Sequence, residues 1–522
     1  MSSISMPCKE VSVAAHKPSI ADASRDRWVL IATVLGSSME FIDGTVVNVS
    51  LPSIQSAFHA TGSQVQWIVE AYALFLSALI LVGGSLGDRF GLRRCFLAGV
   101  ILFAGASAWC GVAPSVEHLL IARCLQGIGG ALLVPNSLAL LSTNFSPAKR
   151  GRAIGTWSGF ASMMTALGPI LGGWMVEHGS WRYVFFLNVP LAIATVWITL
   201  RKIPNVAPEL EQRKLDWPGA LLGTLGLAAV TFSLLQWSAP GEHAPFIGAA
   251  GVILLAVFLC VEWRAKTPLM PLDLFRSLRF TGANLLTFFL YGALSSALFY
   301  LPLNLIQVQR YSPSQSGAAL LPLVAIMFLL ARWAGGLIER VGPRIPLMVG
   351  PVLAGLGYAL FARPGLGGSY WATYFPAIAL LGLGMTISVA PLTTVVMSSV
   401  DQKRTGSASG VNNAVSQVAA LLALALSAPL FLHLFTGSLR GDLTRNAVSP
   451  ITSYAVQHQA SLLAAVQTAD PLARLAVNQA FVTSFRWIVL LAAASSLAAG
   501  AVAAFTIGGS KPGEATKEPS LS

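Results

Sequence analysis

Four of the ionisable residues inside long apolar stretches of the sequence could together do chemistry, because a charged side chain is costly to bury there. Glu40 and Asp43 are three residues apart, so a helix would place them on one face. Glu70 and Arg123 lie in two later apolar stretches. Burial favours a protonated carboxyl group and a neighbouring arginine favours the charged form, so carboxylates that share one guanidinium can bind and release a proton. We expect a proton-coupling site in which Asp43, linked to Arg123, carries the proton, while Glu40 or Glu70 helps to receive a cationic group of a substrate.

Two simpler interpretations stay open for these residues. Asp43 and Arg123 could form a static buried ion pair, and either glutamate could extend to water at the membrane surface. Three amide side chains in apolar stretches, Asn136, Asn412 and Gln417, are further candidates for binding a substrate. Polar side chains in transmembrane helices often bond only to a neighbouring helix, so most such residues are expected to be structural.

The elements that must position these residues are transmembrane helices. Of the 522 residues, 55% are hydrophobic and 10% are charged, whereas an ordinary soluble protein has about 25% charged residues. A helix needs roughly 20 apolar residues to cross the hydrocarbon core of a membrane. Such stretches predict an all-α integral membrane protein with fourteen spans, at residues 28–49, 65–86, 95–113, 117–141, 152–176, 183–200, 217–237, 245–263, 280–306, 314–338, 346–362, 371–398, 406–432 and 485–508.

The positions of lysine and arginine predict the orientation of these spans. With the N-terminus placed in the cytoplasm, 24 of the 33 basic residues fall in cytoplasmic tails and loops. Cytoplasmic loops of membrane proteins carry such an excess, so the charges favour an even number of spans with both termini inside. Asp43, Glu70 and Arg123 then lie near one level, roughly 9 Å from the outer edge at about 1.5 Å per residue. A net charge of +12 divided among short loops argues against a nucleic-acid-binding patch.

An internal repeat divides the fourteen spans. Residues 85–93 and 336–344 share the pattern acid-Arg-x-Gly-x-Arg at a displacement of 251, and a Leu-Pro pair recurs at a displacement of 250. We expect two six-helix bundles that face the same way, as in transporters built from parallel repeats, with two inserted helices between them. The expected parts are a cytoplasmic tail at 1–27, a first bundle at 28–200, inserted helices at 217–263, a second bundle at 280–508 with an outer loop at 433–484, and a cytoplasmic tail at 509–522.

Five segments carry a resemblance to a known family. Residues 41–52 read Phe-Ile-Asp-Gly-Thr-Val-Val-Asn-Val-Ser-Leu-Pro, and residues 84–94 read Gly-Ser-Leu-Gly-Asp-Arg-Phe-Gly-Leu-Arg-Arg. Residues 123–130 read Arg-Cys-Leu-Gln-Gly-Ile-Gly-Gly, residues 168–173 read Gly-Pro-Ile-Leu-Gly-Gly, and residues 181–190 read Trp-Arg-Tyr-Val-Phe-Phe-Leu-Asn-Val-Pro. Together they resemble the major facilitator superfamily, specifically its fourteen-helix drug:proton antiporter branch, the multidrug efflux permeases.

The resemblance implies the major facilitator fold and a gating role for two of the segments. The loop after the second span is similar to the cytoplasmic gate of the family, and the fifth span is similar to its antiporter motif. Glycines permit tight turns and close helix packing, and a proline within a helix bends it. The gating residues implied are Gly84, Gly87, Asp88, Arg89, Gly91, Arg93, Gly168, Pro169, Gly172 and Gly173.

The resemblance also implies proton-coupled efflux of drugs or other small amphipathic organic molecules across a cell membrane, such as a bacterial inner membrane. A dedicated exporter or importer of one metabolite is the alternative, because the fold does not determine the substrate. The expected partners are membrane lipid, protons and the small-molecule substrate, with a periplasmic adaptor protein as a further candidate and no nucleic acid. We expect no cofactor, no metal and no enzymatic activity, because the seven histidines have no metal-ligand spacing and no pattern of nucleophile and base is recognisable.

Overall fold

The computed structural model describes residues 20–145, 147–204, 216–236, 243–265, 268–400 and 405–508, and the regular elements in these ranges are helices. The first group is α1 (Ile20–Phe58), α2 (Gly62–Phe90), α3 (Leu92–Val112), α4 (Val116–Asn144), α5 (Pro147–His178), α6 (Tyr183–Phe186) and α7 (Asn188–Lys202). The two helices expected to be inserted between the bundles are α8 (Trp217–Leu235) and α9 (Ala244–Arg264). The last group is η1 (Leu272–Arg276), α10 (Leu278–Leu303), η2 (Asn304–Val308), α11 (Pro313–Ala319), α12 (Leu321–Val341), α13 (Arg344–Leu360), α14 (Tyr370–Ser398), α15 (Thr405–Arg445), α16 (Pro450–His458), η4 (Ala460–Ala465) and α17 (Pro471–Thr506).

The helices follow the predicted spans in order, with two differences. The sixth predicted span is divided at Leu187 into α6 and α7. The region predicted as an outer loop at 433–484 is largely helical, because α15 continues to Arg445 and is followed by α16, η4 and the start of α17. Hydropathy detects the part of a helix that crosses the membrane, but it does not detect a helix that continues into water.

Twelve helical stretches in the described part of the chain are long and apolar enough to cross a membrane. The two other predicted spans correspond to α5 and α13. α13 has 17 residues, which is slightly short for a span. α5 has 32 residues, and the side chains of several of them lie outside the described part of the chain. The chain is therefore a multi-pass membrane protein, and its described part contains twelve apolar spans.

The two copies of the repeated loop have the same backbone structure. Gly91 ends α2 with a φ angle of 98°, and Gly342 ends α12 with a φ angle of 73°. In each case the amide of the glycine donates to the carbonyl four residues earlier. A positive φ angle is readily available only to glycine, so this residue type is required at both positions.

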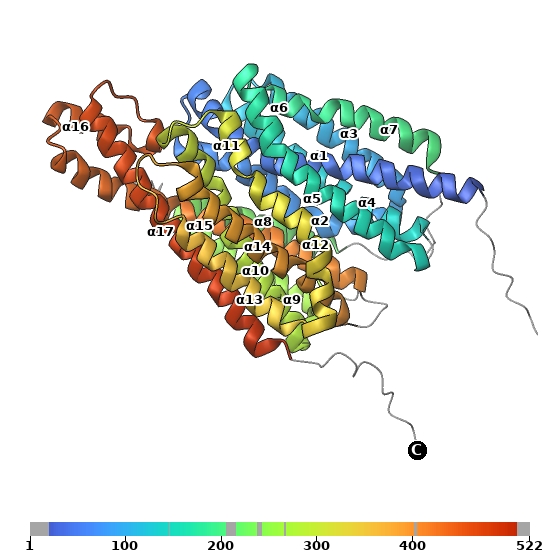
Figure 1. The fold of residues 1–522 in the computed structure, drawn as a ribbon. Helices are drawn as coiled ribbons and strands as arrows, with labels where there is room; N and C mark the ends of the chain where they lie inside the picture. Colours follow the sequence, from blue (N-terminus) through green and yellow to red (C-terminus); the bar gives the residue numbers. More distant parts are fainter. Residues whose placement is uncertain are drawn as a thin grey trace, which may run out of the picture.

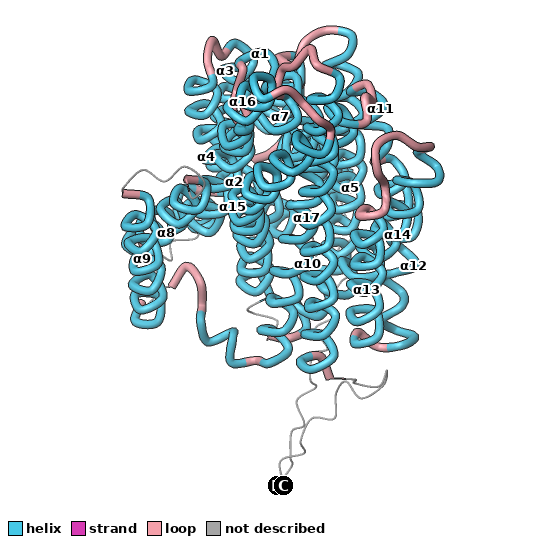
Figure 2. The backbone as a smooth tube through the Cα atoms, turned by 90° about the vertical axis from the view of Figure 1, so that its left-hand side faces the viewer, coloured by secondary structure: helices cyan, strands magenta, loops and turns pink. Residues whose placement is uncertain are grey.

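The helices form two groups that diverge toward the end of the molecule where α1 begins and α17 ends (Figure 1). We call this end the tail end. The opposite end, formed by the connections at residues 59–61, 309–312 and 446–470, is called the junction end. α8 packs against α2 and α15, and α9 packs against α8, so the inserted pair lies beside the two groups (Figure 2).

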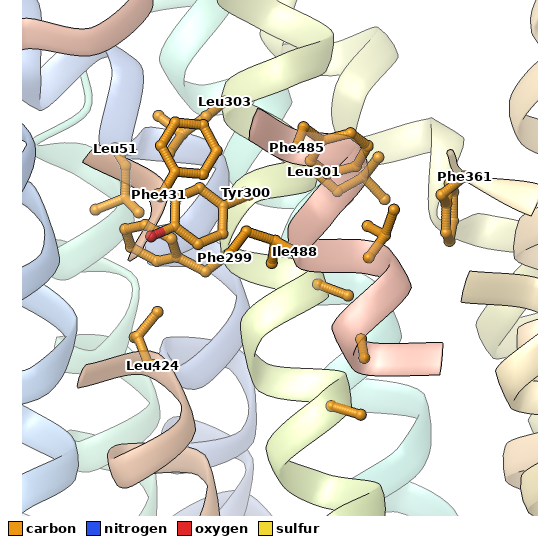
Figure 3. Close-up of a cluster of buried hydrophobic side chains, with 14 of the residues drawn as sticks. Leu51, Phe299, Tyr300, Leu301, Leu303, Phe361, Leu424, Phe431, Phe485 and Ile488 are labelled. Carbon is orange, nitrogen blue, oxygen red and sulfur yellow. The ribbon is translucent and has the colours of Figure 1, made fainter. Parts of the chain in front are cut away.

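A buried apolar cluster joins the helix groups near the junction end (Figure 3). The rings of Tyr300 on α10 and Phe431 on α15 are stacked, with their centroids 4.4 Å apart and an angle of 3° between the planes. Phe481 on α17 contacts Phe431 edge-on at 4.9 Å. Leu51 of α1 belongs to the same cluster and is fully buried. The cluster therefore connects the first helix to the last group of helices.

Candidate functional site

The centre of the site is an ion pair between Asp43 on α1 and Arg123 on α4. Nη1 of Arg123 lies 2.5 Å from Oδ2 of Asp43. The side chain of Asp43 is 0% exposed and that of Arg123 is 1% exposed. The structure thus brings together the two residues that the sequence paired. Removing one partner would leave a buried charge uncompensated, so each residue depends on the other.

Amide side chains complete the surroundings of Asp43. Nε2 of Gln126 donates to its Oδ1 at 2.8 Å, and Nδ2 of Asn188 donates to the same oxygen at 3.4 Å. Gln126 also accepts a hydrogen bond from Arg123 at 2.7 Å, and Asn188 donates to Oγ of Ser107 at 2.9 Å. Neither amide was expected from the sequence as a site residue. Gln126 could have been found because it lies three residues after Arg123 on the same helix face.

The α2 helix holds the other side of the arginine. Nε of Arg123 donates to the carbonyl oxygen of Ile68 at 2.9 Å. The guanidinium lies 4.4 Å from the ring centroid of Tyr72, which is within the range of a cation–π interaction. Arg123 therefore links α1, α2 and α4. Protonation of Asp43 would change the contacts that Arg123 makes with all three helices.

Glu40 and Glu70 are buried, and within the described part of the chain neither pairs with Arg123. Glu70 is 0% exposed, and both of its carboxylate oxygens lack a hydrogen-bond partner. Oε2 of Glu40 also lacks a partner. Buried polar groups in proteins are usually hydrogen-bonded, so these oxygens can accept a proton or a donor group from a bound molecule.

Asn136 joins α4 to α2 through its amide nitrogen, whereas its Oδ1 is buried without a hydrogen-bond partner among the described residues. Its Nδ2 donates to the carbonyl oxygen of Gly83 at 2.9 Å and to the carbonyl four residues earlier in its own helix at 2.7 Å. A Cβ atom at Gly87 would overlap Oδ1 of Asn136, whereas one at Gly84 would make only an ordinary contact at 3.6 Å. The glycine at 87 is therefore required by helix packing.

The other two amide candidates lie on α15. Nδ2 of Asn412 donates to Oδ1 of Asn284 at 3.1 Å and to Oγ1 of Thr287 at 2.7 Å, which joins α15 to α10. Gln417 lies on the same helix and is half-buried. Asn412 thus makes the kind of interhelical contact that was the simpler expectation for it.

Arg93 in the first turn of α3 caps a neighbouring helix. Its Nε donates to the carbonyl of Thr199 at 3.3 Å, and its Nη2 donates to the carbonyl of Leu200 at 3.0 Å. A positive charge is favourable at the C-terminus of a helix, here α7. The guanidinium of Arg89 lies over the ring of Phe90, at 5.4 Å from its centroid. The side chain of Asp88, for which the resemblance implies a gating role, lies outside the described residues.

Two glycines of the α5 motif allow α5 to pack directly on α1. A Cβ atom at Gly168 would overlap Oγ1 of Thr45, and one at Gly172 would lie 2.6 Å from Cγ2 of Val46. Oγ1 of Thr45 also contacts the carbonyl of Thr165 at 3.1 Å. These contacts lie within one helical turn of the buried ion pair, so α1 cannot move there without affecting α5.

The rest of the motif connects the two helix groups. A Cβ atom at Gly173 would overlap the carbonyl oxygen of Pro313, which begins α11. The contact is reciprocal, because a Cβ atom at Gly317 of α11 would overlap the carbonyl oxygen of Pro169 in α5. The backbones of α5 and α11 are therefore in direct contact, and the α5 motif lies between the ion-pair helix and the second group.

Hydrogen bonds across the two groups also hold the junction end closed. Glu177 at the end of α5 accepts hydrogen bonds from Oγ of Ser312 at 2.9 Å and from the backbone amide of Ser314 at 3.1 Å. Nε2 of Gln307 donates to Oε1 of Gln55 at 2.8 Å. Each contact joins a residue of the first group to a residue of the second.

Comparisons with known proteins agree with this arrangement. The chain is 34% identical over 516 residues to the tetracenomycin C resistance and export protein of Streptomyces glaucescens, covering 95% of this chain and 94% of the relative. It is 32% identical over 430 residues to the multidrug resistance protein Stp of Mycobacterium tuberculosis, covering 81% and 79%. A bacterial homologue of the human lysosomal transporter Spinster, solved in an inward-facing and unoccupied conformation, shares the fold with a TM-score of 0.64 at 18% identity, over 92% of this chain and 97% of that structure.

A family model described as Major Facilitator Superfamily matches residues 33–424, which is most of the chain. The match includes α1, α2 and α4, which hold the ion pair, and α5 with its glycine motif. By this match, its relatives and its fold, the chain belongs to the Major Facilitator Superfamily of membrane transporters.

Proposed function

We propose that this chain is a proton-coupled exporter of drugs or other small amphipathic organic molecules, of the fourteen-helix drug:proton antiporter type. The observation that carries the proposal is the buried Asp43–Arg123 pair. The charge of this carboxylate is balanced by one arginine, so small movements of the helices can make it bind or release a proton. The named activities of the relatives, resistance and export of antibiotics, support the choice of substrate class.

In the proposed cycle, the closed junction end and the intact ion pair belong to the state that has released its proton. A proton that binds Asp43 removes the charge that holds Arg123. α1 then shifts against the glycines of α5, and α5 carries the shift to α11 through the contacts of Pro169 and Gly173. The junction end opens or closes as a unit, because tightly packed backbones cannot deform continuously. Substrate and proton thus cross in opposite directions and in alternating steps.

We further propose that the tail end faces the cytoplasm, with both termini inside. The excess of basic residues in loops at that end supports this orientation. α5 and α13 then complete fourteen spans, as two bundles of six and the inserted α8 and α9. The cycle requires the membrane, protons and a small molecule, and none of the described features supports the expected periplasmic adaptor.

Substrate-driven proton flux in liposomes tests the proposal. Purified protein is reconstituted with a pH-sensitive dye inside, and puromycin, lincomycin and tetracenomycin C are added in turn, with a protonophore as the control. We expect several of these unrelated compounds to drive proton movement in the antiport direction. A response to one compound alone would favour a dedicated exporter, and proton movement in the same direction as the substrate would contradict antiport.

A further inference from the structure

A cavity of about 370 Å³ lies between the two helix groups at the junction end, away from the Asp43 pair. Its wall is formed by the end of α1, the start of α2, α10, α15 and the short helix η4, together with Gln236 at the end of the inserted helix α8. The volume is in the range of small-molecule sites in proteins, which are about 300–1,000 Å³. No part of the proposed cycle uses this cavity.

The lining of the cavity combines aromatic rings with amides and contains no ionisable side chain other than a tyrosine. Phe299, Tyr300 and Phe431 supply an apolar wall in which two rings are stacked (Figure 3). Gln66 and Gln236 add amide groups that can both donate and accept hydrogen bonds. The amides of Gln55 and Gln64 and the hydroxyl groups of Thr61, Ser63 and Ser461 also line the cavity. Neutral polar groups beside an aromatic wall are typical of a site that orients an uncharged ring-containing molecule.

The polar residues of the cavity also connect the two helix groups. Nε2 of Gln66 on α2 donates to the carbonyl of Leu424 on α15 at 2.6 Å, and Gln66 is 2% exposed. Nε2 of Gln55 on α1 donates to the carbonyl of Leu462 in η4 at 3.1 Å. A molecule in the cavity would therefore contact the residues that hold the junction end closed.

One wall of the cavity is a strained segment. Leu463 in η4 has a φ angle of 55° and a ψ angle of −129°, which is rare for any residue except glycine. Its side chain is 9% exposed, lines the cavity and packs on Gly62, where a Cβ atom would lie 3.0 Å from Cδ1 of Leu463. A strained residue persists only where its surroundings fix it, and such residues often stand at ligand sites or switches. The side of η4 away from α1 is held by Arg474, which donates to the carbonyl of Ala464 at 3.1 Å.

We propose that this cavity is a second binding site, for an uncharged, ring-containing substrate on its way out, and that η4 is the movable wall that closes it. The proposal rests on the proposed export function. It gives the helical segment between α15 and α17 a role, and it gives the inserted helix α8 a direct part in substrate binding through Gln236. A permanent cation is disfavoured, because no carboxylate lines the site to balance its charge.

Protection of an introduced thiol tests the site. Ser461 is exposed and lines the cavity, whereas Ser449, also exposed, lies before α16 and outside it. Ser461→Cys and Ser449→Cys are made in full-length protein with three native cysteines replaced by serine: Cys260, which is exposed, Cys124, which is half-buried, and Cys8, which lies outside the described residues. In proteoliposomes, the uncharged dye Nile red is expected to slow maleimide labelling of Ser461→Cys at least five-fold and to leave Ser449→Cys unchanged. Ethidium, a permanent cation, is expected to protect neither thiol.

Two further variants separate binding in the cavity from a general effect of the dye. Gln236→Leu removes an amide at the end of α8 and is expected to reduce the protection by Nile red at least three-fold. Leu463→Gly relieves the strain and removes a wall, and it is expected to speed labelling of Ser461→Cys without dye. Equal labelling of both thiols with and without Nile red, at a dye concentration that the protein transports, would overturn the site.

Transport of Nile red in the same proteoliposomes keeps the two proposals apart. Proton-driven transport without protection would contradict the second site alone. Protection without proton-driven transport would support the site and contradict the proposed export function. If Nile red is not transported and also does not protect the thiol, both proposals are contradicted.

Discussion

Gln55 of α1 and Gln307 of η2 are hydrogen-bonded to each other across the junction end, with a distance of 2.8 Å between Oε1 and Nε2. The two residues are 252 positions apart, close to the displacement of 251 that separates the two copies of the gate loop. The contact thus joins nearly equivalent positions of the two halves. Such a position lies near the axis between the halves and reports directly on whether the junction end is closed.

A disulfide between these positions is expected to stop transport. In Gln55→Cys/Gln307→Cys, oxidation would hold the junction end closed, so substrate could not leave on that side. We expect loss of most of the efflux on oxidation and its recovery after a reducing agent, measured in one vesicle preparation. Each single cysteine variant is the matched control. Unchanged efflux with a complete cross-link would show that this end does not need to open.

Asp43→Asn is expected to abolish proton-driven efflux while the protein still inserts in the membrane. Asparagine keeps the shape of the side chain but cannot take up a proton or balance the charge of Arg123. Breaking a buried ion pair from one side costs about 3–5 kcal/mol, so a lower melting temperature is also expected. The measurement is drug accumulation in cells with and without a protonophore, at matched protein levels. Asp43→Glu, which keeps the charge, should retain more activity, and full proton-driven efflux by Asp43→Asn would exclude Asp43 as the proton carrier.

Glu70→Gln is expected to separate charged from neutral substrates. Both carboxylate oxygens of Glu70 are buried without a partner, so a cationic substrate can gain from them and a neutral one cannot. We expect transport of ethidium to fall at least ten-fold and transport of an uncharged compound to change less than three-fold. Glu40→Gln is the companion variant. An equal loss for both classes of substrate would assign Glu70 to proton coupling instead.

Gly172→Ala and Gly173→Ala are expected to impair transport through packing. An added methyl group at 172 would press on Val46 of α1, and one at 173 would overlap the backbone of α11 at Pro313. Overpacking of this kind typically costs about 1–3 kcal/mol. Gly105→Ala on α3, where a Cβ atom meets nothing within 4 Å, is the control and should not lower the melting temperature, because alanine favours a helix more than glycine does. If both glycine variants kept the melting temperature and the efflux of the unaltered protein, these close contacts would not be needed.

Closure of the junction end should weaken in acid because of Glu177. Hydrogen bonds from Ser314 and Ser312 hold the pKa of Glu177 below its usual 4.5. The carboxylate contact is therefore fully present above about pH 4.5 and is lost as the pH falls through the lowered pKa. Spin labels on His118→Cys and Ser369→Cys, in a protein without its native cysteines, would measure the distance across this end. We expect the population with a longer distance between the labels to grow in acid. Glu177→Gln is expected to show this longer distance already at neutral pH. A distance that changes neither with pH nor with the substitution would contradict this role of Glu177.

Much of the fold could be predicted from the sequence because the membrane imposes simple requirements on it. Each span needs a long apolar stretch, and its backbone must satisfy its own hydrogen bonds as a helix. The order of helices, the inserted pair and the repeat all follow from hydropathy and from the glycines at 91 and 342, whose positive φ angles few other residues can adopt. The prediction ended a span at residue 432 and placed an outer loop after it, whereas α15 continues to Arg445, because the apolar pattern that marks a span ends before the helix does.

The sequence alone determined which residues of the candidate site are costly to bury, and so it singled out Asp43, Arg123, Glu40 and Glu70. The sequence also led us to expect the link between Asp43 and Arg123. Only the tertiary structure decided the rest of the grouping. It surrounded the pair with Gln126, and it left both carboxylate oxygens of Glu70 and one of Glu40 without a hydrogen-bond partner among the described residues. The physical reason is that burial depends on one residue and its neighbours in the chain, whereas pairing depends on how helices far apart in the sequence approach each other. The same reason explains why the cavity under Leu463 could not be expected from its sequence.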